Sequence, residues 1–224
     1  MKNAPCVFCF SIILLLCATI LSPAGLASEP EPSIGLVLSG GGARGLAHVG
    51  VLKVIEEAGI KVDYITGTSM GALIGALYAI GYSPDHLEQI VRSIHWDEIL
   101  TDRISRRSIS LEEKEEDARY AISFPMKDGN ISLPKGLIAG HNVAEMISRL
   151  TWSVHNIEDF TSFPIPFSCV ATDIITGEPV VLDHGYLPDA LRASSAIPSI
   201  FSPVNINGQM LADGFLTKNL PVSE

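Results

Sequence analysis

Ser69 stands at the centre of the pentapeptide GTSMG, residues 67–71, which follows the pattern G-x-S-x-G. An apolar strand-like run precedes it, and an apolar helical segment, residues 72–80, follows it. A strand-to-helix elbow of this kind forces unusual backbone angles on its central residue, and Gly67 and Gly71 leave room for the turn. The elbow also places the hydroxyl at a helix N-terminus, where free N–H groups favour negative charge. The pattern predicts a nucleophile; a serine that only caps the helix is the alternative.

A second glycine-rich stretch, GGGARG at residues 40–45, directly follows the first predicted strand. Its spacing satisfies G-x-G-x-x-G, the pattern of a dinucleotide-binding loop, which also requires an acid at the exit end of the second strand. Asp63 has about the right spacing but precedes its strand, so it would lie at the opposite edge of the sheet. We therefore interpret the loop as a row of backbone donors beside Ser69, in which the amides of residues 41–43 could bind an oxyanion.

A serine nucleophile needs a base, and the sequence offers histidines and one well-placed aspartate. In an α/β-hydrolase the histidine follows the serine, late in the chain. His48 precedes Ser69, and no later histidine lies in a late glycine-flanked loop: His86, His95, His141, His155, His184. Asp213, in the segment LADGF, follows a predicted strand and precedes a glycine. It is the better candidate for the base, although Asp-Gly is also a common turn sequence.

The predicted elements around these residues alternate between strands and helices. Short apolar runs predict strands at residues 34–39, 61–66, 119–124, 130–133, 166–173 and 178–183. A hairpin is predicted at residues 206–215, with a polar turn at Asn207 and Gly208. Apolar residues at helical spacing predict helices at residues 46–58, 72–80, 142–151 and 187–194, and another that begins at Pro84 with Ser83 as N-cap. Alternating strands and helices indicate a mostly parallel sheet covered on both faces. We therefore expect an α/β fold, a three-layer α/β/α domain with a mostly parallel central sheet, over residues 34–224.

Residues 92–118 are rich in charge and weakly periodic, which predicts short helices and a mobile excursion. Trp96, Ile99 and Leu100 form an apolar stripe within this region. Such a stripe either forms a lip over the site or packs on the core, and core packing is the commoner case.

The N-terminus differs in composition from the rest of the chain. Residues 1–27 combine Lys2, an apolar run and small residues near Ala27, the pattern of a cleaved secretory signal. An uncleaved anchor is the alternative, but the run is shorter than the roughly 20 residues of a spanning helix. Residues 28–33 read as a short linker, so we expect an exported protein whose mature part keeps Cys169 alone, as a buried thiol.

Charge narrows the possible partners. The 224 residues include 25 acids and 15 bases, a formal charge of −10, which argues against nucleic acid as a partner. Arg44 could orient the glycine loop, meet an anionic head group or form an ordinary surface ion pair.

Taken together, these motifs resemble those of the patatin-like phospholipases. The resemblance covers about residues 33–224 and rests on five stretches in order: GGGARG, GTSMGA, ATDIITGEPVVL, LRASSAIPSIFSPV and LADGFLTKNLPV. In that family the serine of G-x-S-x-G is the nucleophile, and an aspartate followed by Gly-Gly or Gly-Ala is the base. The resemblance implies a histidine-free dyad of Ser69 and Asp213. It also implies an oxyanion hole at Gly40, Gly41, Gly42, Ala43, Arg44 and Gly45.

The implied activity is hydrolysis of carboxylic esters in membrane phospholipid or another lipid, without metal or cofactor. An acyltransferase with the same acyl-enzyme and a non-catalytic lipid-binding or secretion module are the alternatives. Because an unperturbed aspartate is a weak base, we expect burial to raise the pKa of Asp213.

The sequence departs from the family pattern in two places. Phe215 stands where the family usually has Gly or Ala, which predicts altered specificity or an altered presentation of Asp213. The chain ends at NLPVSE, where members usually continue into a further strand and helix, so the resemblance predicts a domain truncated at its C-terminus. Some secreted members carry an outer-membrane barrel downstream of this point.

Overall fold

The computed structural model describes residues 33–102, 126–127, 130–131 and 138–223. The helices and strands it describes lie in a compact unit, residues 34–224. The predicted signal peptide, the predicted linker up to residue 32 and the predicted strand at residues 119–124 lie outside the described residues. Among the helices described, none has the length and hydrophobicity needed to cross a membrane.

Six strands form the central sheet, in the order β1-β2-β5-β8-β7 with β6 paired to β5. Their bounds are β1 Gly35–Leu38, β2 Tyr64–Thr68, β5 Phe167–Asp173, β6 Pro179–Leu182, β7 Val204–Ile206 and β8 Gln209–Asp213. β1, β2 and β5 are parallel, β6 and β8 run antiparallel to β5, and β7 runs antiparallel to β8. Four of the six strands therefore share one direction, which confirms the predicted α/β class with a mostly parallel sheet. A separate pair is formed by β3 (Met126–Lys127) and β4 (Asn130–Ile131).

Strand β5 carries β2 and β8 one after the other along the same edge. β2 pairs with β5 as far as Thr68 opposite Val170, and β8 pairs from the next residue onward, with Asp213 opposite Ala171. The other edge of β5 is occupied by β6 at both places. Because β2 is parallel and β8 antiparallel to β5, the C-terminal ends of β2 and β8 meet head to head. This topology brings the residue after Thr68 next to Asp213.

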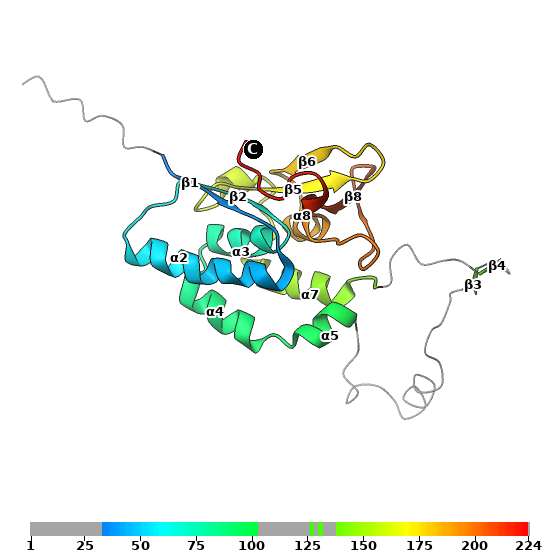
Figure 1. Cartoon of the computed structure of the whole chain (residues 1–224), viewed down its shortest axis with the longest axis horizontal. Helices are drawn as coiled ribbons and strands as arrows, with labels where there is room; N and C mark the ends of the chain where they lie inside the picture. Colours follow the sequence, from blue (N-terminus) through cyan, green and yellow to red (C-terminus); the bar gives the residue numbers. More distant parts are fainter. Residues whose placement is uncertain (1–32, 103–125, 128–129, 132–137, 224) are drawn as a thin grey trace, which may run out of the picture. The chain divides into compact units, whose positions relative to one another are not determined.

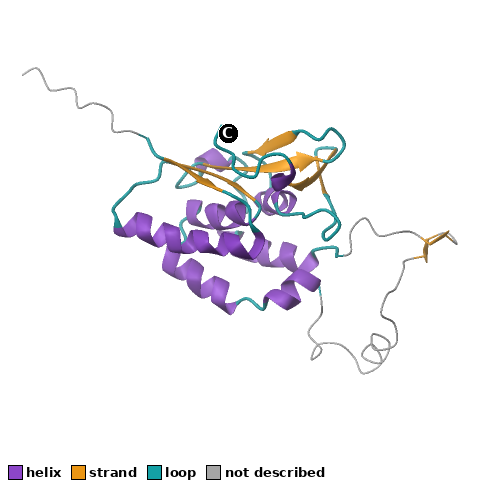
Figure 2. Cartoon of the chain, viewed as in Figure 1, coloured by secondary structure: helices purple, strands orange, loops and turns teal. Residues whose placement is uncertain are grey.

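The α-helices that the structure describes lie on one face of the sheet (Figure 1, and in purple in Figure 2), so the helical layer predicted on the other face is not found among the described residues. Their bounds are α2 His48–Glu57, α3 Met70–Ala79, α4 Pro84–Ser93, α5 Trp96–Thr101, α7 His141–Leu150 and α8 Leu187–Ser194. Short 3-10 helices are η1 Gly42–Ala47, η2 Trp152–Val154, η3 Phe160–Ser162 and η4 Gly214–Leu216. α3 and α8 pack directly on the strands, and α4, α5 and α7 lie behind them (Figure 1). On the opposite face, Thr68 Oγ1 donates to the carbonyl of Lys218 in the C-terminal segment, at 2.9 Å.

Local signals in the sequence explain where several elements begin and end. Ser83 caps α4 by accepting a hydrogen bond from the amide of His86 at 3.3 Å, and Pro84 occupies the first turn, as predicted. The predicted hairpin turn at Asn207 and Gly208 has positive φ at both residues, 52° and 86°, which suits the right-handed twist of the strands. The beginning of α7 is capped from α5: the carboxylate of Asp102 accepts the backbone N–H groups of residues 140–142.

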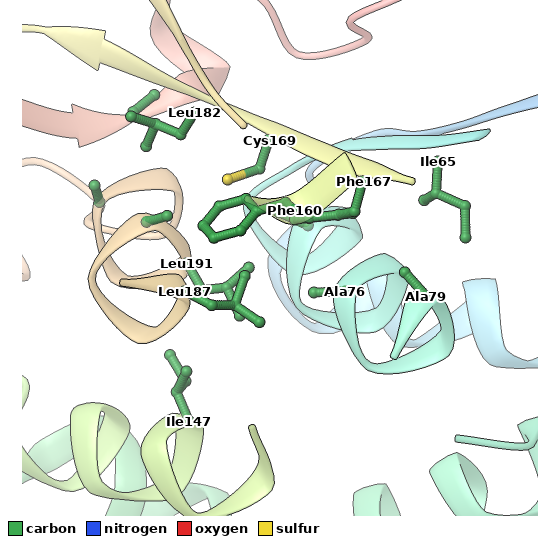
Figure 3. Packing of buried hydrophobic residues seen from close by; sticks show 14 of the residues in the cluster. Ile65, Ala76, Ala79, Ile147, Phe160, Phe167, Cys169, Leu182, Leu187 and Leu191 are labelled. Carbon is green, nitrogen blue, oxygen red and sulfur yellow. The ribbon is translucent and has the colours of Figure 1, made fainter. Parts of the chain in front are cut away.

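The core lies between the sheet and helices α3 and α8 (Figure 3). Helix α3 is apolar along most of its length because it is enclosed on several sides. Three phenylalanines pack against one another at the start of β5: Phe160 stacks on Phe163 and lies tilted against Phe167. The Cys169 thiol is fully buried among them, as predicted, and burial raises its pKa well above the ordinary value. Phe167 lies opposite Ile65 in the sheet, so this layer adjoins the strand that leads to Ser69.

Candidate active site

The turn between β2 and α3 is the strained elbow that the G-x-S-x-G pattern predicts. Ser69 has φ 54° and ψ −123°, a backbone conformation that residues with a Cβ rarely adopt. The flanking glycines are sterically required, since a methyl group on Gly71 would lie 2.3 Å from the carbonyl oxygen of Leu38. A methyl group on Gly67 would lie 2.7 Å from the amide nitrogen of Ala72. The neighbouring strand and helix therefore hold Ser69 in a conformation that it would not take alone.

Ser69 and Asp213 form a direct hydrogen bond. Ser69 Oγ donates to Asp213 Oδ2 at 2.7 Å, and the two residues are 6% and 1% exposed. The serine hydroxyl makes no capping bond to the amides of α3, so the alternative of a simple helix cap does not describe it. A hydroxyl bonded to a buried carboxylate is the arrangement needed for a general base to take its proton.

Asp213 is held by three further contacts, one to its carboxylate and two to its backbone. The side-chain oxygen Oδ1 accepts a hydrogen bond from the backbone N–H of Phe215 at 3.0 Å. The backbone carbonyl of Asp213 accepts one from the hydroxyl of Thr172 at 3.1 Å. Its own amide donates to the carbonyl of Ala196 at 2.9 Å. Burial raises the pKa of Asp213, while the hydrogen bonds from Phe215 and Ser69 partly offset this by lowering it. The direction is the one predicted, and it makes the carboxylate a stronger base.

The glycine-rich loop lies against the nucleophile. A methyl group on Gly40 would lie 3.0 Å from Cβ of Ser69. Two of the predicted donors are already engaged, since the amide of Gly40 donates to the carbonyl of Asn219 and that of Arg44 to the carbonyl of Gly41. Gly45 is buried against Met70 and forms part of η1. Of the six residues predicted to form the oxyanion hole, Gly41, Gly42 and Ala43 are therefore the ones whose amides we consider as donors.

The three remaining amides belong to Gly41, Gly42 and Ala43, at the N-terminal end of η1. Within the described part of the chain they make no backbone hydrogen bond, and Gly42 has a positive φ of 52°. The first amides of a helix have no partner inside it, so they are available to an anion. Arg44 is exposed and forms no ion pair with a described residue, which leaves its side chain available to a ligand.

Ser194 is a residue whose role the motifs did not reveal. It is fully buried at the end of α8, where its hydroxyl accepts the amide of Ser69 at 3.0 Å and donates to the carbonyl of Val170 at 2.7 Å. The side chain thus ties the elbow to β5. The stretch LRASSAIPSIFSPV carried this residue as part of the family resemblance, but a serine inside a helix has no pattern that marks such a bridge.

The other candidates from the sequence lie elsewhere or play supporting parts. All six histidines are described, and none of them bonds Ser69 or Asp213; His48 Nε2 instead bonds the carbonyl of Ser39 at 2.9 Å. Asp63 Oδ2 accepts the amide of Ile34 at 2.9 Å, at the start of β1 and away from the glycine loop. This position confirms the argument against a dinucleotide site. Among the described residues no cluster of three or more metal-ligating side chains occurs.

Phe215, the departure from the family pattern, contributes its backbone to the site. Its amide holds Asp213 Oδ1, while the residue is 46% exposed. The preceding Gly214 cannot carry a side chain, because a Cβ there would lie 2.3 Å from the carbonyl oxygen of Val170.

Comparisons with known proteins identify relatives of this chain. The sequence profile described as "Patatin-like phospholipase" matches residues 36–224. An uncharacterized NTE family protein of Mycobacterium tuberculosis is 31% identical over 204 residues, covering 90% of this chain and 48% of that protein. Lysophospholipase NTE1 of Saccharomyces cerevisiae is 33% identical over 192 residues, covering 86% of this chain and 10% of that protein. The chain thus spans about half or less of the length of these relatives.

Among solved structures, VipD from Legionella pneumophila superposes with a TM-score of 0.51 at 17% identity, over 84% of this chain and 46% of that one. At this identity the likeness supports the fold alone. It agrees with the mixed, mostly parallel sheet and its packed helices.

Proposed function

Because the chain belongs to the patatin-like phospholipase family, we propose that it is a serine lipid acyl hydrolase that uses Ser69 and Asp213 as a catalytic dyad. The family supports hydrolysis of an ester bond, and its lysophospholipase-named relatives support a lipid ester as substrate. The observation that carries the proposal is the 2.7 Å hydrogen bond from Ser69 Oγ to Asp213 Oδ2.

In the first half-reaction, Asp213 Oδ2 accepts the hydroxyl proton as Ser69 Oγ attacks the ester carbonyl carbon. The resulting oxyanion accepts hydrogen bonds from the amides of residues 41–43, and each such donor contributes about 3 kcal/mol to the transition state. The carbon–oxygen bond to the alcohol then breaks, and Asp213 returns the proton to the leaving alkoxide. An acyl-enzyme remains on Ser69.

In the second half-reaction, a water molecule replaces the alcohol. Asp213 takes a proton from the water as the hydroxide attacks the acyl carbon, and the proton passes to Ser69 Oγ as the fatty acid departs. The burial that raises the pKa of Asp213 serves both steps, because a carboxylate of higher pKa is a better base and its protonated form remains an acid able to return the proton.

The proposal is tested with p-nitrophenyl butyrate and the variants Ser69→Ala and Asp213→Asn, with Asp189→Asn as a matched control. Asp189 is an exposed aspartate in the first turn of α8. We expect both dyad variants to lose activity by at least about a hundredfold, the range for a removed general base, and the control to keep it. Full activity in either dyad variant would refute the mechanism.

Two alternatives are decided by the products. An acyltransferase would give a transferred ester in place of fatty acid when an alcohol is added, because only the acceptor of the acyl-enzyme differs. A non-catalytic lipid-binding or secretion module would bind lipid without releasing either product. Phosphatidylcholine vesicles with the products identified by mass spectrometry separate these cases and report the preferred acyl position.

Export is a further part of the proposal, supported by the signal-like composition of residues 1–27. Mass spectrometry of the protein from the native host should find an N-terminus at residue 28. An N-terminus at Met1 in the mature protein would contradict it.

A further inference from the structure

A small internal cavity lies behind the nucleophile, among the helices. Its volume is about 30 Å³, and its wall is formed by side chains of α3, α4 and α7, together with Leu46, Trp96 and Leu191. Thr151 is the polar residue in this wall, and its hydroxyl is bonded to the carbonyl of Ile147 at 2.8 Å. Figure 3 shows Ile147 of α7 directed toward Leu191 of α8. An alkyl group could enter this space without leaving a buried polar group unpaired.

The cavity has in its wall two residues from the segments around the proposed oxyanion site. Met70, which follows Ser69 in the chain, lines it, and so does Leu46 from η1, the helix that begins with the glycine loop. Met70 also packs directly against Gly45. Each of the two segments that would hold the reacting carbonyl therefore contributes one side chain to the cavity wall.

A groove between α4, α5 and α7 adjoins the cavity. The groove has a volume of about 450 Å³ and shares Ile90, Ile94, Met146 and Leu150 with the inner cavity. Its lining combines apolar side chains with polar ones, among them Glu145 and Arg149. A volume of this size is in the range of pockets that bind small molecules.

Two residues of the apolar stripe predicted within residues 92–118 line these two spaces. Trp96 lines the cavity and Ile99 lines the groove, whereas Leu100 is 44% exposed. The indole N–H of Trp96 is satisfied by the carbonyl of Val91 at 3.2 Å. Because this N–H is already bonded within the protein, the indole ring presents apolar surface to the cavity.

We propose that the cavity and groove together form the channel for the acyl chain of the substrate, leading from Ser69 between α3, α4 and α7. This inference rests on the proposed function and adds the route of the chain. A space of about 30 Å³ holds roughly one water molecule, so the chain enters by displacing side chains from the shared wall. Met146, which joins both spaces, is flexible enough to change rotamer for this purpose.

The test compares kcat/KM for p-nitrophenyl dodecanoate with that for the butyrate, expressed as a ratio. Ile94→Trp narrows the shared wall and should lower this ratio at least about tenfold, since each methylene left in water loses about fourfold in affinity. Met146→Ala widens the wall and should raise the ratio. Val54→Trp is the control, because Val54 is 62% exposed on α2 and lines neither space. The channel would be refuted if Ile94→Trp and the control Val54→Trp gave the same ratio of kcat/KM values.

A binding measurement separates failure of the channel from failure of the proposed function. Calorimetry with dodecanoate on Ser69→Ala, which cannot hydrolyse an ester, should show binding that Ile94→Trp weakens about tenfold in the same background. If the wild-type protein does not hydrolyse p-nitrophenyl butyrate but dodecanoate binding that Ile94→Trp weakens is observed, the proposed function is wrong and the channel stands. If butyrate is hydrolysed and dodecanoate binds equally with and without Ile94→Trp, the channel is wrong.

Discussion

Removing the hydroxyl of Ser194 should weaken both the fold and the reaction. In Ser194→Ala, the amide of Ser69 loses its acceptor at 3.0 Å and the carbonyl of Val170 loses its donor at 2.7 Å. Ser194 is fully buried, so water has no ready access to replace these bonds. Each buried group left unsatisfied costs about 1–3 kcal/mol, and for these two groups we expect the free energy of unfolding to fall by about 2–6 kcal/mol.

The effect on catalysis follows from the strain in the elbow. The amide held by Ser194 belongs to the residue with φ 54°, so its release lets the nucleophile relax away from Asp213. A displacement of about 1 Å costs up to about a hundredfold in rate, and we expect kcat/KM to fall between tenfold and a hundredfold.

Ser195→Ala is the matched control, and urea unfolding with p-nitrophenyl butyrate hydrolysis is the assay. Ser195 is next in the chain, half-buried, and its hydroxyl donates to the carbonyl of Leu191 at 2.7 Å within the helix. Its loss should cost about 0.5–1 kcal/mol and leave the rate unchanged. Equal effects of the two substitutions on stability and rate would refute the positioning role of Ser194.

Three further results are expected. Gly71→Ala should prevent folding, because its methyl group would lie 2.3 Å from the carbonyl oxygen of Leu38. The control Gly50→Ala has open space around it in α2 and should fold normally. Expression level and circular dichroism distinguish the two outcomes. The value of kcat/KM should fall at acid pH, with a midpoint above the ordinary aspartate pKa of about 3.9, because Asp213 must be ionised and burial raises its pKa. A midpoint below that value would contradict the assignment of Asp213 as the base. Because a raised pKa means that the native state binds the Asp213 proton more tightly than the unfolded state, native stability declines as pH rises from about 3.9 through the native pKa. Urea unfolding of Asp213→Asn should therefore show greater stability than the wild type at pH 7, and a difference that shrinks as the pH falls toward 3.9.

The sequence predicted those parts of the molecule that depend on local pattern. The G-x-S-x-G elbow, the cap at Ser83 and the turn at Asn207 each follow from residue types at fixed offsets, and the structure contains all three. Asp213 was found because it follows a strand and precedes Gly214, a position where a side chain has no room.

What the sequence could not supply depends on contacts between distant segments. Nothing in the local pattern indicates that β8 runs antiparallel and meets the end of β2 along β5, although this topology is what places Asp213 beside Ser69. The bridge made by Ser194 and the use of the Gly40 amide by Asn219 are likewise long-range. Periodicity predicts that a strand exists, but its neighbours are chosen by the packing of the whole sheet.

Fluorophosphonate labelling tests the central claim most directly, because the reagent reacts only with a serine that a base has activated. Peptide mass spectrometry should find the label on Ser69, and the labelling rate of Asp213→Asn should be about a hundredfold lower than that of the wild type. A label on another residue, or the same rate in both proteins, would contradict a Ser69 nucleophile activated by Asp213.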